Sequence, residues 1–106
     1  MATRKIVLVT GANYGCGYET VKAFLKSPNP YHVFLGSRSW AKGNNAVQTL
    51  RKDCADSKNS VALLQVDLTD DQSIENAFDQ VKSSHDRLDI LINNAGALEQ
   101  SSLSEM

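Results

Sequence analysis

A glycine-rich segment, TGANYGCG at residues 10–17, directly follows the apolar run KIVLV. Glycine inside a helix costs about 1 kcal/mol relative to alanine, so three glycines where a helix should begin need a physical reason. Glycine allows a positive φ and lets the backbone approach a ligand closely. A loop that leads from a buried strand into a helix also presents free N–H groups and the positive end of the helix dipole, which together bind phosphate. The segment indicates a phosphate-binding loop; the alternative is a tight turn that uses glycine only for conformation and packing.

Two more polar segments follow apolar runs further along the chain, VDLTD at 66–70 and NNAG at 93–96. If the runs before them are strands of one parallel sheet, all three segments lie at its carboxyl edge, where ligands bind in open α/β sheets. Each segment also has a structural alternative. Asp67 could cap the helix that follows it, and the paired asparagines could form a turn, because asparagine tolerates the left-handed backbone conformation.

The spacing of apolar residues predicts alternating strands and helices. The expected strands are residues 5–9, 31–37, 60–67 and 88–93, and the expected helices are residues 17–26, 41–54 and 69–85. This alternation is typical of βαβ units with a parallel sheet, and right-handed crossovers give it a doubly wound layout. The predicted fold class is therefore α/β, a Rossmann-like doubly wound parallel sheet that is incomplete, with about four strands and three helices.

The segment 69–85 gives the clearest helical pattern, because its apolar residues recur on one face at helical spacing. At its start, Thr69 and Gln72 have the spacing of a capping box. At its end, His85 is expected to be solvated or to cap the helix.

Length and composition limit the classes of function. The 106 residues allow one small domain at most. A net charge of −1 gives no reason to expect nucleic acid or an anionic membrane as partner. No apolar stretch approaches the roughly 18 residues of a membrane span, and the N-terminus lacks the pattern of a secretory signal. Cys16 and Cys54 are too few for a disulfide framework or a metal site, so a cytoplasmic location is expected.

With three motifs in register, residues 5–97 resemble the short-chain dehydrogenase/reductase family. The resemblance implies that residues 1–106 are a partial NAD(P)-binding Rossmann domain. In that family a TGxxxGxG loop cradles the cofactor pyrophosphate, an Asp after the third strand meets adenine, and NNAG steadies the sheet beside the cofactor. Cys16 would contact the cofactor through its backbone N–H, and Asn94 would be mainly structural. The resemblance implies the following cofactor-binding residues: Gly11, Asn13, Tyr14, Gly15, Cys16, Gly17, Ser37, Arg38, Asp67, Leu68, Asn94, Ala95 and Gly96.

The end of the second expected strand bears on which nicotinamide cofactor binds. An NAD site uses a carboxylate there to accept a hydrogen bond from the ribose 2′-OH. No acidic residue occurs between Glu19 and Asp53; Ser37 occupies the position of that acid and Arg38 follows it. Arginine can hold a phosphate bidentately, so the sequence predicts NADP as cofactor, with NAD as the weaker option. The alternative is that Arg38 is a surface cation, and Tyr14 stands where some NADP-binding relatives carry a second basic residue.

Catalysis in the resembling family belongs to a Ser and a Tyr-x-x-x-Lys that follow NNAG and serve hydride transfer at a carbonyl or alcohol group. Here no Tyr follows Tyr31, no Lys follows Lys82, and the serines at 101, 102 and 104 come too soon. No catalytic residue is therefore predicted. Two functions remain open: the NADP-binding part of a short-chain oxidoreductase, or a noncatalytic dinucleotide-binding or interaction module. A methyltransferase is less favoured, because the acidic residue expected at the end of the second strand is missing.

The family-like strand order would place the first strand between the second and the fourth. Residues 88–93 would then form an open edge, since the part of the family fold expected beyond them is missing from this sequence. Unpaired backbone beside apolar side chains invites edge-to-edge association. We therefore expect self-association through this edge, in addition to a small-molecule dinucleotide as ligand.

Overall fold

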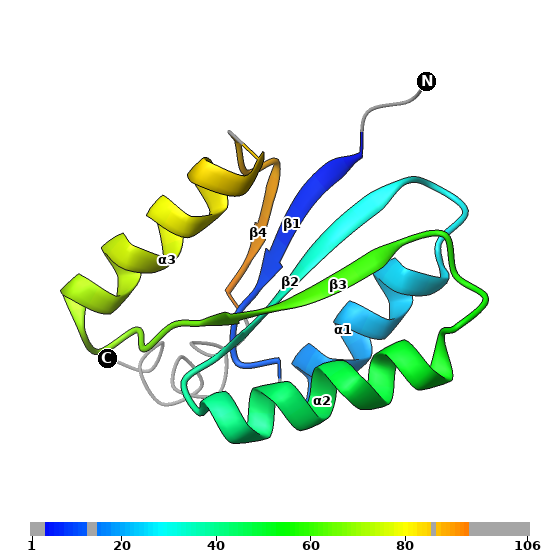
Figure 1. Cartoon of the computed structure of the whole chain (residues 1–106), viewed down its shortest axis with the longest axis horizontal. Coiled ribbons are helices and arrows are strands. Elements are labelled where there is room, and N and C mark those ends of the chain that lie inside the picture. The colour runs from blue at the N-terminus through cyan, green and yellow to red at the C-terminus, as the bar shows by residue number, and fades with distance from the viewer. Residues whose placement is uncertain (1–3, 13–14, 86, 94–106) are drawn as a thin grey trace, which may run out of the picture.

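A computed structural model of the chain describes residues 4–12, 15–85 and 87–93, which form one parallel four-stranded sheet with three helices (Figure 1). The elements are β1 (Lys5–Val9), α1 (Gly15–Lys26), β2 (Tyr31–Ser37), α2 (Trp40–Asp53), β3 (Ser60–Gln65), α3 (Asp71–His85) and β4 (Ile90–Ile92). The strand order is β3-β2-β1-β4. The predicted α/β Rossmann-like class and the predicted strand order are both confirmed.

The sheet is covered on both faces, with α1 and α2 on one side and α3 on the other (Figure 1). Strands buried on both faces are expected to be apolar at every position, and β1 satisfies this rule from Ile6 to Val9. Its residues Val7 and Val9 belong to the core beneath α1 and α2, whereas Ile6 and Leu8 belong to the core beneath α3. This packing fixes the sheet as a rigid support for the loops at its carboxyl edge.

The start of α3 differs from the sequence prediction. The capping box of Thr69 with Gln72 is wrong, because Asp70 caps the helix and accepts a hydrogen bond from Gln72 N at 3.0 Å. Thr69 turns back and donates from its N (3.0 Å) and its Oγ1 (2.6 Å) to Asp67 Oδ1. The turn formed by Asp67 delays the helix to Asp71 and ends β3 early, at Gln65.

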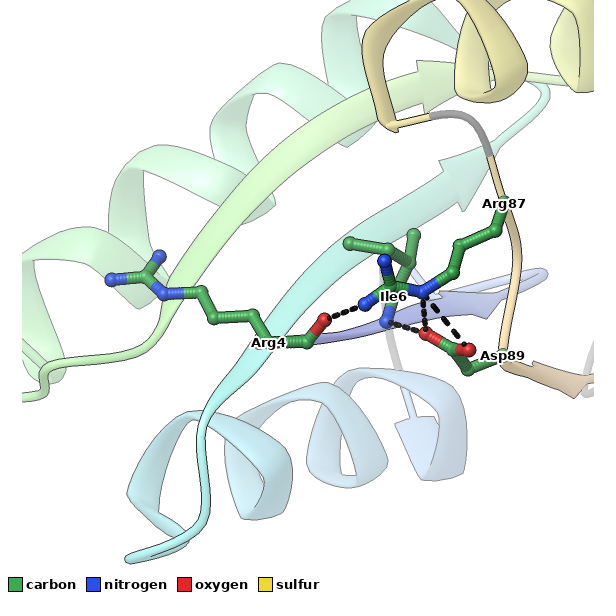
Figure 2. A network of polar contacts seen from close by, with 4 residues as sticks. All are labelled: Arg4, Ile6, Arg87 and Asp89. Carbon is green, nitrogen blue, oxygen red and sulfur yellow. Dashed lines mark hydrogen bonds and ion pairs between the residues drawn. The ribbon is translucent and has the colours of Figure 1, made fainter. Parts of the chain in front are cut away.

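A polar network joins the beginning of β4 to the beginning of β1 (Figure 2). Asp89 Oδ2 accepts from Ile6 N at 2.7 Å, and Asp89 N donates to Ile6 O at 2.9 Å. Arg87 Nε lies 3.0 and 3.2 Å from the two carboxylate oxygens of Asp89, and Arg87 also donates to the carbonyl of Arg4. The bond from Ile6, followed by the contact with Arg87, lowers the pKa of Asp89. The network sets the register in which Val7 lies opposite Ile90.

At the C-terminal end of α3, the imidazole of His85 stacks on the imidazole of His32 from β2. The His32 and His85 rings lie 4.4 Å apart at an interplanar angle of 21°, and Phe34 meets both rings edge-on. His32 Nδ1 lies 2.6 Å from Ser60 Oγ. His85 was predicted to be solvated or to cap the helix; its Nδ1 does neither, because this atom is buried and has no hydrogen-bond partner in the part of the chain that the structure describes.

This pair gives the fold an acid-sensitive contact. Burial, reinforced by His85, Arg4 and Arg51, lowers the pKa of His32 from 6.5 to about 4. Between these two pH values His32 binds a proton in the unfolded chain but not in the folded chain. The contribution of His32 to the free energy of unfolding is therefore complete above pH 6.5 and decreases as the pH falls toward 4. Because His32 is only half-buried and therefore screened, we expect a loss of about 1 kcal/mol in unfolding free energy between pH 7.5 and pH 5.

Urea denaturation at the two pH values, with His32→Phe as the comparison, measures this loss. The variant keeps an aromatic ring against His85 but cannot titrate there, so its unfolding free energy should change less with pH. Equal pH dependence in the two proteins would contradict the assignment to His32.

Candidate functional site

The candidate site is the carboxyl edge of the sheet, where α1 and α2 begin (Figure 1). Two glycines of the loop after β1 have left-handed backbone, Gly11 with φ 59° and Gly15 with φ 63°. Any L side chain is strained at such angles. A Cβ built on Gly15 would meet no atom of the described residues within 4 Å, so with respect to them the space beside this backbone is open. The first turn of α1 is therefore approachable by a ligand group, as a phosphate-binding loop requires.

The loop is held on both sides by neighbouring strands. Ala12 N donates to Gly36 O at 2.9 Å, which ties the loop to β2, and Thr10 N donates to Ile92 O at 3.0 Å, which ties it to β4. The Thr10 hydroxyl donates to Asn93 Oδ1 at 3.0 Å. Asn93 thus joins the ends of β1 and β4, in keeping with the sheet-steadying role that the resemblance implies for NNAG.

In the turn between β2 and α2, the neighbouring residues Ser37 and Arg38 have different environments. Ser37 is buried, with 1% of its surface exposed, and its hydroxyl donates to Ser39 O at 2.9 Å. A Cβ on Gly43 would lie only 2.8 Å from Ser37 Cβ, so helix and strand are in close contact here. Arg38 is exposed, and its carbonyl accepts from Gln65 Nε2 at 3.3 Å. The long cation is therefore on the surface of the edge, while the serine serves the turn and the packing.

Asp67 and Leu68 follow β3 at the same edge. The two hydrogen bonds from Thr69 to Asp67 lower the pKa of this carboxyl, and the positive charge of Arg38 lowers it further. Asp67 is therefore an anion near neutral pH, in electrostatic contact with Arg38. Leu68 leaves 39% of its surface exposed. The edge thus brings an apolar surface, a carboxylate and a guanidinium together.

Other predicted residues have simpler placements. Cys16 is exposed in the first turn of α1 and its carbonyl accepts from Thr20 Oγ1 at 2.8 Å, while Gly17 is buried. Five of the predicted cofactor-binding residues lie outside the described part of the chain: Asn13, Tyr14, Asn94, Ala95 and Gly96.

Residues that the sequence prediction missed also lie at this edge. Gly36 and Gln65 hold the loop and the turn through the bonds described above. Trp40 begins α2 with 58% of its surface exposed. A lone tryptophan directly after the helix cap Ser39 was the available signal for the last of these.

An apolar depression lies away from this edge. It has a volume of about 530 Å³ and lies between α1, the start of β2 and the end of β4, lined in part by Phe24, Tyr31 and Ile92. It contains none of the predicted site residues. Its size reflects an uncovered sheet margin, so the glycine loop and its charged neighbours define the candidate site better than the cavity does.

Among the described residues no group of three or more His, Cys, Asp or Glu side chains could hold a metal ion, and no helix is long and apolar enough to cross a membrane.

Comparison with known proteins agrees with this geometry. The family model described as short chain dehydrogenase matches residues 5–106. A short-chain dehydrogenase/reductase of Talaromyces stipitatus is 42% identical over 102 residues, which is 96% of this chain and 38% of that protein. Menthone neomenthol reductase from Mentha piperita superposes with a TM-score of 0.80 at 34% identity, covering 88% of this chain and 32% of that one. L-sorbose reductase from Gluconobacter frateurii, solved with NADPH and L-sorbose, gives 0.74 at 25% identity, covering 87% and 33%. The chain therefore spans about a third of the length of the proteins it matches.

Proposed function

Since this chain belongs to the short-chain dehydrogenase/reductase family, we propose that it is the NADP-binding part of an oxidoreductase acting on a carbonyl or alcohol group. The observation that carries the cofactor choice is the exposed Arg38 at the carboxyl edge, in a stretch without acidic residues from 20 to 52. NADPH bound to the similar L-sorbose reductase supports it. When bound, the nicotinamide ring would supply or accept the hydride.

The glycine loop would hold the pyrophosphate. Gly11 and Gly15 adopt left-handed angles that let the backbone turn toward the ligand, and the open space beside Gly15 fits the approach of a phosphate. Backbone N–H groups of Gly15, Cys16 and Gly17 in the first turn of α1 are without acceptors within the helix and form the positive end of its dipole. The anion would therefore be bound mainly by backbone. By their match to the family motif, Asn13 and Tyr14 would line the same loop, and Asn94, Ala95 and Gly96 the next one.

The adenosine end would lie over β2 and β3. Arg38 would pair with the 2′-phosphate, and Asp67 would accept from the adenine amino group beside Leu68. Ser37 would contribute its small size and its backbone, because its hydroxyl already donates to Ser39 O. Arg38 lies close enough to Asp67 for its charge to lower the pKa of that carboxyl. The two side chains could therefore bind the phosphate and the base of the same adenosine 2′-phosphate.

Replacement of Arg38 tests the cofactor assignment. We expect Arg38→Ala to weaken NADPH about tenfold or more, because at least one charge-assisted hydrogen bond is lost. NADH affinity should be little changed, since NADH lacks the 2′-phosphate. Isothermal titration of both cofactors measures this.

Lys52→Ala is the matched control. Lys52 is an exposed cation in the last turn of α2, the helix that follows Arg38. It should leave both affinities unchanged. An equal loss of NADPH and NADH affinity in Arg38→Ala would overturn the assignment of Arg38 to the phosphate.

A further inference from the structure

We propose that Trp40 forms one wall of the adenine subsite and stacks its indole on the base. The inference rests on the proposed dinucleotide function and adds to it a residue that determines affinity for the adenosine end. Trp40 is the sole tryptophan of the chain.

The exposure of Trp40 has no explanation in the packing of residues 4–12, 15–85 and 87–93. More than half of its surface is exposed, and it belongs to neither of the two core clusters nor to the side chains packed against them. Four large apolar side chains are exposed among the described residues, and of these Trp40 and Leu68 follow the ends of β2 and β3. Two exposed apolar side chains after neighbouring strands at a ligand-binding edge are suited to hold a flat apolar group.

The position of Trp40 at the start of α2 sets the direction of its side chain. Cα–Cβ bonds in a helix tilt toward its N-terminus, so a side chain covers the turn before its own Cα. For Trp40 that turn is Ser37–Ser39, at the carboxyl edge of the sheet. By this tendency the indole would lie toward the turn that contains Arg38.

Hydrogen bonds fasten β3 to this same turn. Val66 N donates to Ser37 O at 3.0 Å, and Gln65 Nε2 donates to Arg38 O at 3.3 Å. The residues that follow β3, Asp67 and Leu68, are therefore held beside the turn that precedes Trp40. A base whose ribose phosphate binds Arg38 would lie between the indole and Leu68.

Stacking of a base on an aromatic side chain makes a measurable contribution to affinity. From its usual strength, Trp40→Ala is expected to weaken NADPH and adenosine 2′,5′-bisphosphate by about 5- to 100-fold. Trp40→Phe, which keeps a ring, should retain most of the affinity. Phe78→Ala is the matched control, an exposed aromatic residue on α3, and should leave both ligands unaffected.

The wild-type protein supplies a second readout that needs no variant. Because Trp40 is the only tryptophan, titration with adenosine 2′,5′-bisphosphate should change the intrinsic fluorescence along the same curve that calorimetry gives. Binding with unchanged fluorescence, or full affinity in Trp40→Ala, would overturn the role of Trp40 while the NADP proposal stands. A wild-type protein that binds neither ligand would overturn both.

Discussion

The purified 106-residue polypeptide is expected to show no carbonyl-dependent oxidation of NADPH. Its two tyrosines in the described region are unsuited to proton transfer at the site. Tyr31 begins β2 and therefore lies at the amino edge of the sheet, opposite the site. Burial and the nearby carboxylate of Asp53 raise the pKa of Tyr18, whereas an acid–base tyrosine works with a pKa closer to neutrality. No lysine follows Lys82 to lower such a pKa.

General acid–base catalysis contributes about 10²–10⁴-fold to a rate, so its loss should remove detectable turnover. The measurement is the disappearance of NADPH absorbance with a panel of ketones and aldehydes. Gly15→Asp is the control, because any side chain is strained at φ 63° and a carboxylate would repel the pyrophosphate. Carbonyl-dependent oxidation that Gly15→Asp abolishes would contradict the prediction.

Self-association through β4 is the second large effect we expect. Among the described strands β4 is at the end of the sheet order beside β1, it has only three residues, and Leu91 leaves 51% of its surface exposed. An apolar edge strand is a template for pairing with another chain. Leu91→Lys places a charge on this edge, so a polypeptide that elutes mostly as oligomers should elute mostly as a monomer after the substitution.

Size-exclusion chromatography with light scattering measures this shift. Gln48→Lys adds the same charge at an exposed position of α2 and should leave the elution unchanged. A wild-type chain that is monomeric and melts sharply without cofactor would instead support a self-sufficient binding module.

The sequence predicted the helices and strands because each is bounded by its own signals. The continuous apolar run of β1 indicated a buried strand, and apolar residues recurring on one face indicated α3. The start of α3 was not predictable in this way. Thr69, Asp67 and Asp70 can each cap or turn, and only the competition among their hydrogen bonds in the folded chain decides between them.

Features of the site that depend on residues distant in sequence were also out of reach. The glycine loop was predictable from the local sequence, because the positive φ angles at Gly11 and Gly15 favour glycine. The burial of the Ser37 hydroxyl depends on how closely Gly43 brings α2 to the sheet. The stacking of His85 on His32 likewise depends on where the last turn of α3 packs against β2. Local spacing contains no information on such contacts.

The pairing of β4 with β1 also determines the order in which the sheet can assemble. Ile6 and Asp89 are bonded across 83 positions of chain, and closing so long a loop in one step is entropically unfavourable. Once β2 and β3 have joined β1, only the connection from Gln65 to Ile90 remains to be closed, which lowers the closure entropy by about 1 kcal/mol. We therefore expect β4 to be the last strand to dock and, with three residues, the first to open. Local opening and intermolecular pairing would then begin at the same strand, so whatever slows the exchange of β4 amide hydrogens should also slow association.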